Sequence, residues 1–213
     1  MQQAFDVLSF GTIGLDYIIR VPYWPTPERG VHAPGEEEHT GGKATNTALF
    51  LAGWGLRVAV SGQAIGDDAV GDRLLALLGQ QPNLDTRFVR RVPGLHSMYC
   101  RILVGPHGDR TIIGIGVDEN PQTTPTPEMI RSARLLTLDL YGGPERVEAA
   151  RLAAEAGLPV VVGDLRQHGH PVLPYTTVAI ASAAEVRKDY PDLTLGGFAR
   201  AVQAAGARDV IIT

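Results

Sequence analysis

The fold of this chain is decided by the stretch His39-Thr40-Gly41-Gly42-Lys43-Ala44-Thr45-Asn46-Thr47-Ala48. Its two glycines let the backbone turn tightly and approach a ligand, and an apolar run to Trp54 that is typical of a helix follows them. Lys43 and Asn46 lie three residues apart on the first turn, so both side chains can point the same way. Free backbone N–H groups and the positive end of the helix dipole gather there, which suits an electron-rich ligand. On this segment alone, a glycine turn before a helix is an equally good interpretation.

The same glycines are excluded from two nucleotide-binding motifs. In a Walker A loop, Glu37 would occupy the position of the first glycine, and Ala44 would replace the Ser or Thr that holds Mg²⁺. No stretch of the chain has the spacing of the dinucleotide-binding fingerprint. The sequence therefore argues against a mononucleotide P-loop, and it lacks the main motif of an NAD-linked dehydrogenase.

The composition is that of an ordinary globular protein. The chain has 213 residues, of which 44% are hydrophobic and 20% charged, and its formal net charge is −4. This charge gives no reason to expect nucleic acid as a partner, and no run of Lys or Arg indicates a membrane surface. Cys100 is the only cysteine, which excludes a disulfide framework. Because we find neither a signal peptide pattern nor a membrane-spanning run, we expect a soluble, cytoplasmic protein.

Strands and helices alternate along most of the chain, which predicts an α/β layered fold with a mostly parallel sheet. Apolar runs typical of buried strands occupy residues 7–10, 57–61, 135–138, 159–162, 178–181 and 210–212. Helical patterns lie between them, over residues 43–54, 144–156 and 195–205, after Asp67 or Asp68, and from Thr126 onward.

Two regions break this alternation. Residues 15–21 form a strand pattern before a proline-rich connection, and residues 98–104 and 110–113 form a β-hairpin pattern around a glycine-containing loop. We expect the strands around residues 15–40 and this hairpin to form a small separate β layer that covers a site at the strand ends.

Three motifs occur in order and carry a resemblance to a known family. They are Gly11-Thr12-Ile13-Gly14-Leu15-Asp16, the segment Gly42-Lys43-Ala44-Thr45-Asn46, and the turn Gly66-Asp67-Asp68-Ala69-Val70-Gly71. From Val7 to Thr213 the chain resembles the ribokinase-like (PfkB) carbohydrate kinase family. The resemblance implies a three-layer α/β/α sandwich with a small β-sheet lid, formed here by about residues 12–40 and 97–117 of a single domain, 1–213. It also implies ATP-dependent phosphorylation of a sugar or nucleoside hydroxyl.

The resemblance assigns substrate-binding residues by position. It implies that Asp16 and Asn46 bind substrate hydroxyls together with Gly42 and Lys43. Asp139, at the end of a predicted strand, is a further candidate that could face the substrate. In some relatives lids pair between subunits, so a homodimer through the lid is a further expectation.

The resemblance also implies ATP and Mg²⁺ as cofactors. Asp164 follows a predicted strand in a neighbourhood similar to the family's Asp-x-x-Arg, and Glu185 stands where the family has Asn-x-x-Glu, with Ser182 in place of the Asn. Both carboxylates are candidates for the nucleotide site, and Glu185 for holding hydrated Mg²⁺. Glu185 is equally well interpreted as an exposed first-turn carboxylate favoured by the helix dipole.

The family's Gly-Ala-Gly-Asp signature, which supplies an anion hole and the catalytic base, does not occur in the sequence. We therefore assign no catalytic residue. Thr213 falls close to where the family's nucleotide-binding region begins, so we expect an incomplete C-terminal part and impaired phosphoryl transfer. The alternative is a catalytically inactive, sugar-binding pseudo-kinase or truncated product. An α/β interaction module is a third, weaker interpretation.

Overall fold

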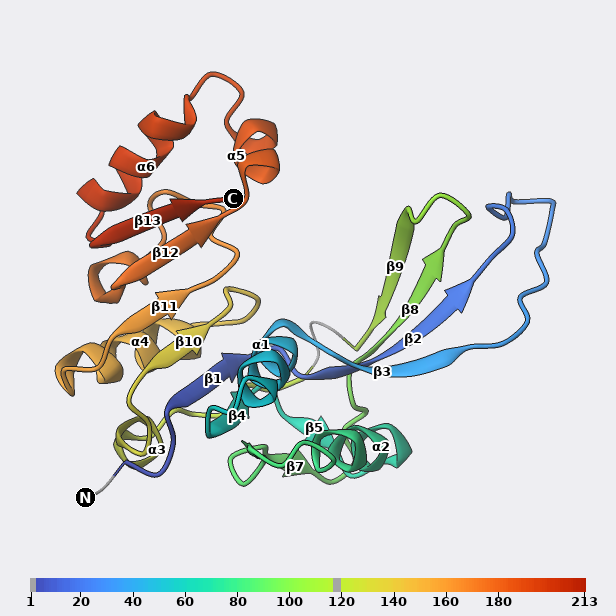
Figure 1. Cartoon of the computed structure of the whole chain (residues 1–213), viewed down its shortest axis with the longest axis horizontal. Helices are drawn as coiled ribbons and strands as arrows, with labels where there is room; N and C mark the ends of the chain where they lie inside the picture. Colours follow the sequence, from blue (N-terminus) through green and yellow to red (C-terminus); the bar gives the residue numbers. More distant parts are fainter. Residues whose placement is uncertain (1–2, 117–119) are drawn as a thin grey trace.

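A seven-stranded, fully parallel sheet forms the centre of the computed structural model, which describes residues 3–116 and 120–213 (Figure 1). The strand order is β13-β12-β11-β10-β1-β4-β6. This sheet confirms the predicted α/β fold. Its strands are β1 (Val7–Gly11), β4 (Val58–Gly62), β6 (Leu84–Asp85), β10 (Leu136–Leu138), β11 (Val160–Val162), β12 (Val178–Ala181) and β13 (Asp209–Ile212).

Helices cover both faces of this sheet and give three layers. Successive side chains of β1 point to opposite faces, so Val7 packs in the core on one side, whereas Leu8 and Phe10 pack in the core on the other. The first core includes residues of α1 (Lys43–Gly53) and α2 (Ala69–Leu78). The second includes residues of α3 (Pro127–Arg131), α4 (Glu145–Glu155), α5 (Ala183–Asp189), α6 (Leu195–Ala204) and the short 3₁₀ helix η1 (Leu173–Tyr175).

A four-stranded second sheet extends from the carboxyl edge of the main sheet (Figure 1). Its order is β3-β2-β8-β9, and it contains the predicted hairpin, in which β8 and β9 pair antiparallel. The predicted separate β layer is thus present, although residue 117 of its expected range lies outside the described residues. The sheet consists of β2 (Gly14–Arg20), β3 (Glu37–Gly41), β8 (Tyr99–Val104) and β9 (Arg110–Ile115).

The second sheet is anchored to the body by the turn before α2. A two-stranded parallel pair, β5 (Ile65–Gly66) and β7 (Arg91–Val92), leads into this turn. Asp68 is the N-cap of α2, with its Oδ1 accepting from Gly71 N at 2.8 Å. The same carboxylate accepts hydrogen bonds from the backbone N and the hydroxyl of Ser97, at 2.8 and 2.7 Å, just before β8. Asp68 therefore joins α2 to the second sheet.

None of the helices within the described residues has the length and apolar character needed to cross a bilayer.

We predict that Asp68→Ala destabilises the protein by about 1–2 kcal/mol, because it removes the cap and the bonds to Ser97. Asp67→Ala is the matched control, since the side chain of Asp67 is exposed and forms a surface ion pair with Arg91. Burial opposes ionisation of Asp68, but the hydrogen bonds from Ser97 and Gly71 outweigh it and lower its pKa. The stabilisation is therefore present at neutral pH and lost as the pH falls through this lowered pKa. Urea unfolding of both variants at two pH values measures it, and equal losses would contradict the assignment.

Candidate functional site

The candidate residues gather where the parallel strands end. The loops after β1, β10, β11 and β12 carry Thr12, Asp139, Asp164 and Ser182, respectively. Because all these strands run in the same direction, their carboxyl ends meet at one edge of the sheet, the edge at which open α/β sheets bind ligands. The N-terminus of α1 and the second sheet lie at this edge too (Figure 1).

The carboxylate of Asp139 is buried and fully engaged within the chain. Its Oδ2 accepts from the backbone N of Thr12 at 2.7 Å and from the Thr12 hydroxyl at 3.0 Å, and its Oδ1 accepts from Tyr141 N at 3.0 Å. A Cβ at Gly11 would lie 2.1 Å from Oδ2, so only glycine allows this close approach. The hypothesis that Asp139 faces the substrate stays a prediction, because the structure shows its oxygens turned to Thr12 and Tyr141.

Arg146 on α4 balances the charge of Asp139. Its side chain is 1% exposed, and its Nε lies 3.5 Å from Asp139 Oδ1. The guanidinium also donates to Gln122 Oε1 at 2.7 Å and to the carbonyl of Tyr141 at 2.8 Å. Burial lowers the pKa of Arg146, and Asp139 opposes that shift. Sequence reasoning missed Arg146, since arginine on a surface helix is ordinarily exposed.

Thr12 fixes the start of α1. Its hydroxyl accepts from the backbone N of Lys43 at 2.8 Å, and its carbonyl accepts from Ala44 N at 3.2 Å. Gly42 has φ +90°, and a Cβ there would lie 2.4 Å from the Thr12 carbonyl oxygen. The expectation of free N–H groups at this helix start is therefore wrong for Lys43 and Ala44, because the glycine brings the two loops close enough for Thr12 to accept from both.

Asp16 lies on β2, between β3 and β8. It pairs in register with His39 on one side and with Cys100 on the other, and a Cβ at Gly41 would lie 2.2 Å from its Oδ1. Burial raises the pKa of Asp16, although a hydrogen bond from the Cys100 thiol works against the shift. Burial and the nearby carboxylate raise the pKa of Cys100 to about 11, so the thiol stays protonated as a donor. The structure thus brings Asp16 to the glycine turn, while Asn46 lies exposed on the first turn of α1.

Lys43 connects the start of α1 to the loop after β11. Its ammonium lies 2.9 Å from Asp164 Oδ2 and 5.8 Å from the centre of the Tyr141 ring. Asp164 has φ +53°, a left-handed conformation that is uncommon outside glycine and often found at functional sites. A residue predicted for the acceptor and one predicted for the nucleotide are therefore in direct contact.

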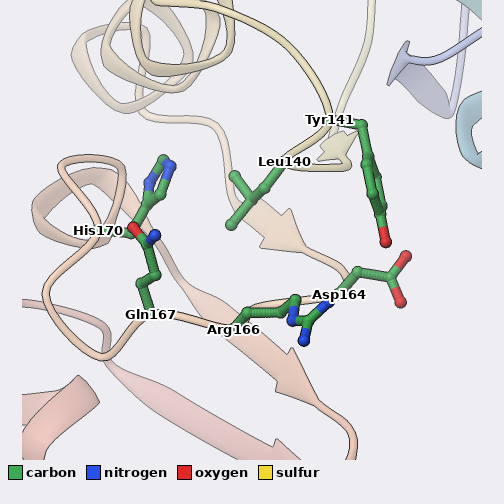
Figure 2. A pocket seen from close by; sticks show the side chains of 6 residues that line it. All are labelled: Leu140, Tyr141, Asp164, Arg166, Gln167 and His170. Carbon is green, nitrogen blue, oxygen red and sulfur yellow. The ribbon is translucent and has the colours of Figure 1, made fainter. Parts of the chain in front are cut away.

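Charged side chains of both signs line a cavity of about 190 Å³ at this point. Arg166 bridges Glu185 at 2.7 Å and Asp189 at 2.8 Å, and the ion pair of Lys43 with Asp164 faces the same cavity. Figure 2 shows the neighbouring cavity of about 180 Å³, in which the side chains of Asp164 and Tyr141 point toward one another. Two cations and two carboxylates around one small space suit an anion with a bound metal.

A complete protein-only metal site is absent from residues 3–116 and 120–213, where no three His, Cys, Asp or Glu side chains converge. Mg²⁺ in phosphoryl-transfer sites uses only one or two carboxylates, together with phosphate oxygens and waters. Asp164 and Glu185 fit that smaller requirement, although the carboxylate of Glu185 is bound to Arg166.

The three layers and the charged cavities at the carboxyl edge are typical of α/β proteins that bind small molecules at their strand ends. The sequence profile of the pfkB family carbohydrate kinases matches residues 4–213. The chain therefore belongs to the pfkB family of carbohydrate kinases, which confirms the resemblance.

Solved structures of sugar kinases share the fold. Ribokinase from Arabidopsis thaliana, solved with ribose and ATP, superposes with a TM-score of 0.80 at 18% identity, over 98% of this chain and 72% of its own. Fructokinase from Halothermothrix orenii superposes with a TM-score of 0.78 at 18% identity, over 98% of this chain and 79% of the fructokinase chain. Ribokinase from Thermotoga maritima superposes with a TM-score of 0.76 at 19% identity, over 98% of this chain and 71% of the ribokinase chain. At these identities the likeness establishes the fold alone.

We predict that Arg146→Met destabilises the protein by about 3–5 kcal/mol, because it leaves the buried Asp139 carboxylate without its cation. Arg151→Met on the same helix is the control, since Arg151 forms surface ion pairs with Glu148 and Glu155 and should cost about 0–1 kcal/mol. Denaturant unfolding of the two variants measures the difference. Comparable losses in both would show that the buried pair has no special weight.

Proposed function

We propose that this chain binds a sugar, free or as part of a nucleoside, as the acceptor of a phosphoryl group, with Asp16, Gly42, Lys43 and Asn46 as its contacts. The observation that carries the proposal is the half-buried carboxylate of Asp16, packed against Gly41 at the glycine turn that opens α1. Membership of the pfkB family supports this assignment.

Each proposed contact has a chemical role. An ionised Asp16 accepts hydrogen bonds from two sugar hydroxyls, and the amide of Asn46 both donates and accepts. Glycine at position 42 removes the side chain that would keep a sugar ring from the backbone. Asp139 acts indirectly in this scheme: it holds Thr12, which in turn accepts from Lys43 N at the start of α1.

We place the phosphates of ATP at the cavity lined by Lys43, Asp164, Arg166 and Glu185. The Arabidopsis ribokinase was solved with ribose and ATP, and we extend this pair of ligand classes to the present chain. ATP supplies the phosphoryl group when it is bound. Lys43 and Arg166 would balance phosphate charge, and Glu185 would help hold hydrated Mg²⁺ once released from Arg166.

The second sheet is proposed to act as the lid of a single domain, residues 1–213, with the lid formed by about residues 12–40 and 97–117. A lid would exclude water from the transferring phosphoryl group. We also propose a homodimer through this sheet, because the edge strand β9 exposes Ile112 and Ile113. The cytoplasmic location stays a prediction from the sequence.

We predict that Asp16→Asn and Asn46→Ala weaken sugar binding about tenfold or more, because each removes a hydrogen bond to the acceptor. Asp192→Asn, exposed in the turn before α6, is the control. Only the ionised form of Asp16 accepts two hydrogen bonds, so the sugar affinity of the unmodified chain should also fall as the pH is lowered. Because burial raises the pKa of Asp16, this fall should occur at a higher pH than for an ordinary aspartate. Titration calorimetry measures both effects, and unchanged affinity in Asp16→Asn would overturn the assignment.

A protein made of these 213 residues should bind sugar without appreciable turnover. No Gly-Ala-Gly-Asp occurs among them, and the loss of anion-hole donors and of a positioned base reduces rates by about 10²–10³-fold and 10²–10⁴-fold, respectively. A coupled ADP-release assay over pentoses, hexoses and nucleosides checks this. Robust turnover would contradict it, and binding without turnover would support the alternative of a catalytically inactive, sugar-binding pseudo-kinase or truncated product.

A further inference from the structure

On one side of the main sheet, the helices cover only part of the strands. The hydroxyl of Ser9 in β1 donates to the carbonyl of Ala44 at 2.8 Å, so α1 lies directly on β1. The strands β11, β12 and β13 lie toward one end of the sheet, away from α1 (Figure 1). The helices α3 to α6 and η1 all bury residues in the core on the other side. Within the described residues, the core beneath α1 and α2 includes no residue of β11, β12 or β13.

The uncovered side of these three strands is apolar. Four of its side chains belong to neither core, and we call them the open face: Val161, Val178, Ile180 and Ile211. They point to the same side of the sheet, because Val161 pairs in register with Val178, and Ile180 with Ile211. Asp209, at the edge of this side, pairs with Arg208 at 2.9 Å. Parallel strands with continuous apolar runs such as these are ordinarily covered on both faces.

The outer side of α1 carries two exposed aromatic side chains. Ala48 and Ala52 are buried on the side that faces the sheet. Two residues along a helix correspond to a rotation of about 200°, so Phe50 lies opposite both alanines and Trp54 opposite Ala52. Phe50 is 70% exposed and Trp54 77%. Two neighbouring aromatic side chains with this exposure are typical of an interaction surface.

The open face and the outer side of α1 are complementary in shape. α1 forms a layer on one part of the sheet, and the open face is the part on the same side that lacks this layer. When two copies face each other across a two-fold axis, α1 of each copy lies on the open face of the other. Four aromatic side chains that bury about 150–250 Å² each give about 600–1,000 Å². The strand residues beneath them add a comparable area, and the total falls in the range of about 1,200–2,000 Å² found in stable interfaces.

We propose that this chain forms a two-fold symmetric dimer in which Phe50 and Trp54 of each copy pack on the open face of the other. The occupant of the open face is thus a second copy of the chain. The proposal is independent of the proposed function, since it uses none of the acceptor or phosphate contacts. It also differs from the lid contact, because the exposed side chains of Ile112 and Ile113 on β9 take no part in it.

Sedimentation equilibrium from about 0.1 to about 100 μM tests the proposal. We expect a monomer–dimer equilibrium whose dissociation constant rises about tenfold or more in Phe50→Ser, which removes an aromatic anchor, and in Ile211→Lys, which places a charge on the open face. Both side chains are exposed in the monomer, so neither variant should lower the unfolding midpoint at concentrations where the unmodified chain is monomeric. Ile112→Ser on β9 is the matched control and should leave this dissociation constant unchanged.

Tryptophan fluorescence shows whether α1 lies in the interface. Trp24→Phe leaves Trp54 as the only tryptophan of the chain. The emission of Trp54 should shift to shorter wavelength as the concentration rises through the dissociation constant, because dimer formation removes the indole from water.

Three results would contradict the proposal. A chain that stays monomeric at about 100 μM would overturn it and leave another polypeptide as the occupant of the open face. A dimer that Ile211→Lys leaves intact, or an emission of Trp54 that is the same in monomer and dimer, would also overturn it. A dimer lost in Ile112→Ser but kept in Phe50→Ser would identify the lid as the contact instead.

Discussion

The buried carboxylate of Asp139 holds together the edge of the sheet on which the whole site depends. Two of its hydrogen bonds go to Thr12 and one goes to Tyr141 N, so the loops after β1 and β10 cannot move apart without breaking them. Thr12 in turn fixes the position of α1, since it accepts hydrogen bonds from the first two backbone N–H groups of that helix. The glycine turn, the first residues of α1 and the backbone of Tyr141 are thus positioned by a single carboxylate in the interior.

A charged group in that position needs a partner, and Arg146 provides it. Removing a carboxylate and a guanidinium from water costs desolvation free energy. Their mutual attraction offsets this free energy only when their other hydrogen bonds are made. Arg146 makes two such bonds, to Gln122 and to the Tyr141 carbonyl. A buried ion pair adds little net stability compared with apolar packing, so we interpret this one as fixing the relative positions of three loops.

Local patterns in the sequence were enough for the layers of the fold. The assignment of successive β1 side chains to opposite cores, and the spacing of the small residues Ala44, Ala48 and Ala52 on α1, follow directly from the periods of strands and helices. Local patterns cannot predict contacts between residues that are distant in the sequence, such as Thr12 and Asp139, which are 127 residues apart. The strands β5 and β7 have only two residues each, which is too short for an alternating hydrophobic pattern to be recognised in the sequence. The glycine motifs predicted where groups approach the backbone closely, but a glycine does not show which group approaches it, so the contacts of Thr12 with Asp139 and Lys43 were not predicted.

The ion pair between Lys43 and Asp164 explains how the acceptor and phosphate regions can communicate under the proposed function. The two side chains are 51% and 39% exposed, so their pairing contributes about 1 kcal/mol at most. A phosphate offers Lys43 a stronger, charge-assisted partner in the same cavity. Under the proposed function, an entering phosphate would displace Asp164 at little cost. Lys43 would then move its ammonium while its backbone N stays bound to Thr12. Because its ion pair with Asp164 is weak, the Lys43 ammonium could bind a phosphate without any change in the proposed acceptor contacts at the glycine turn.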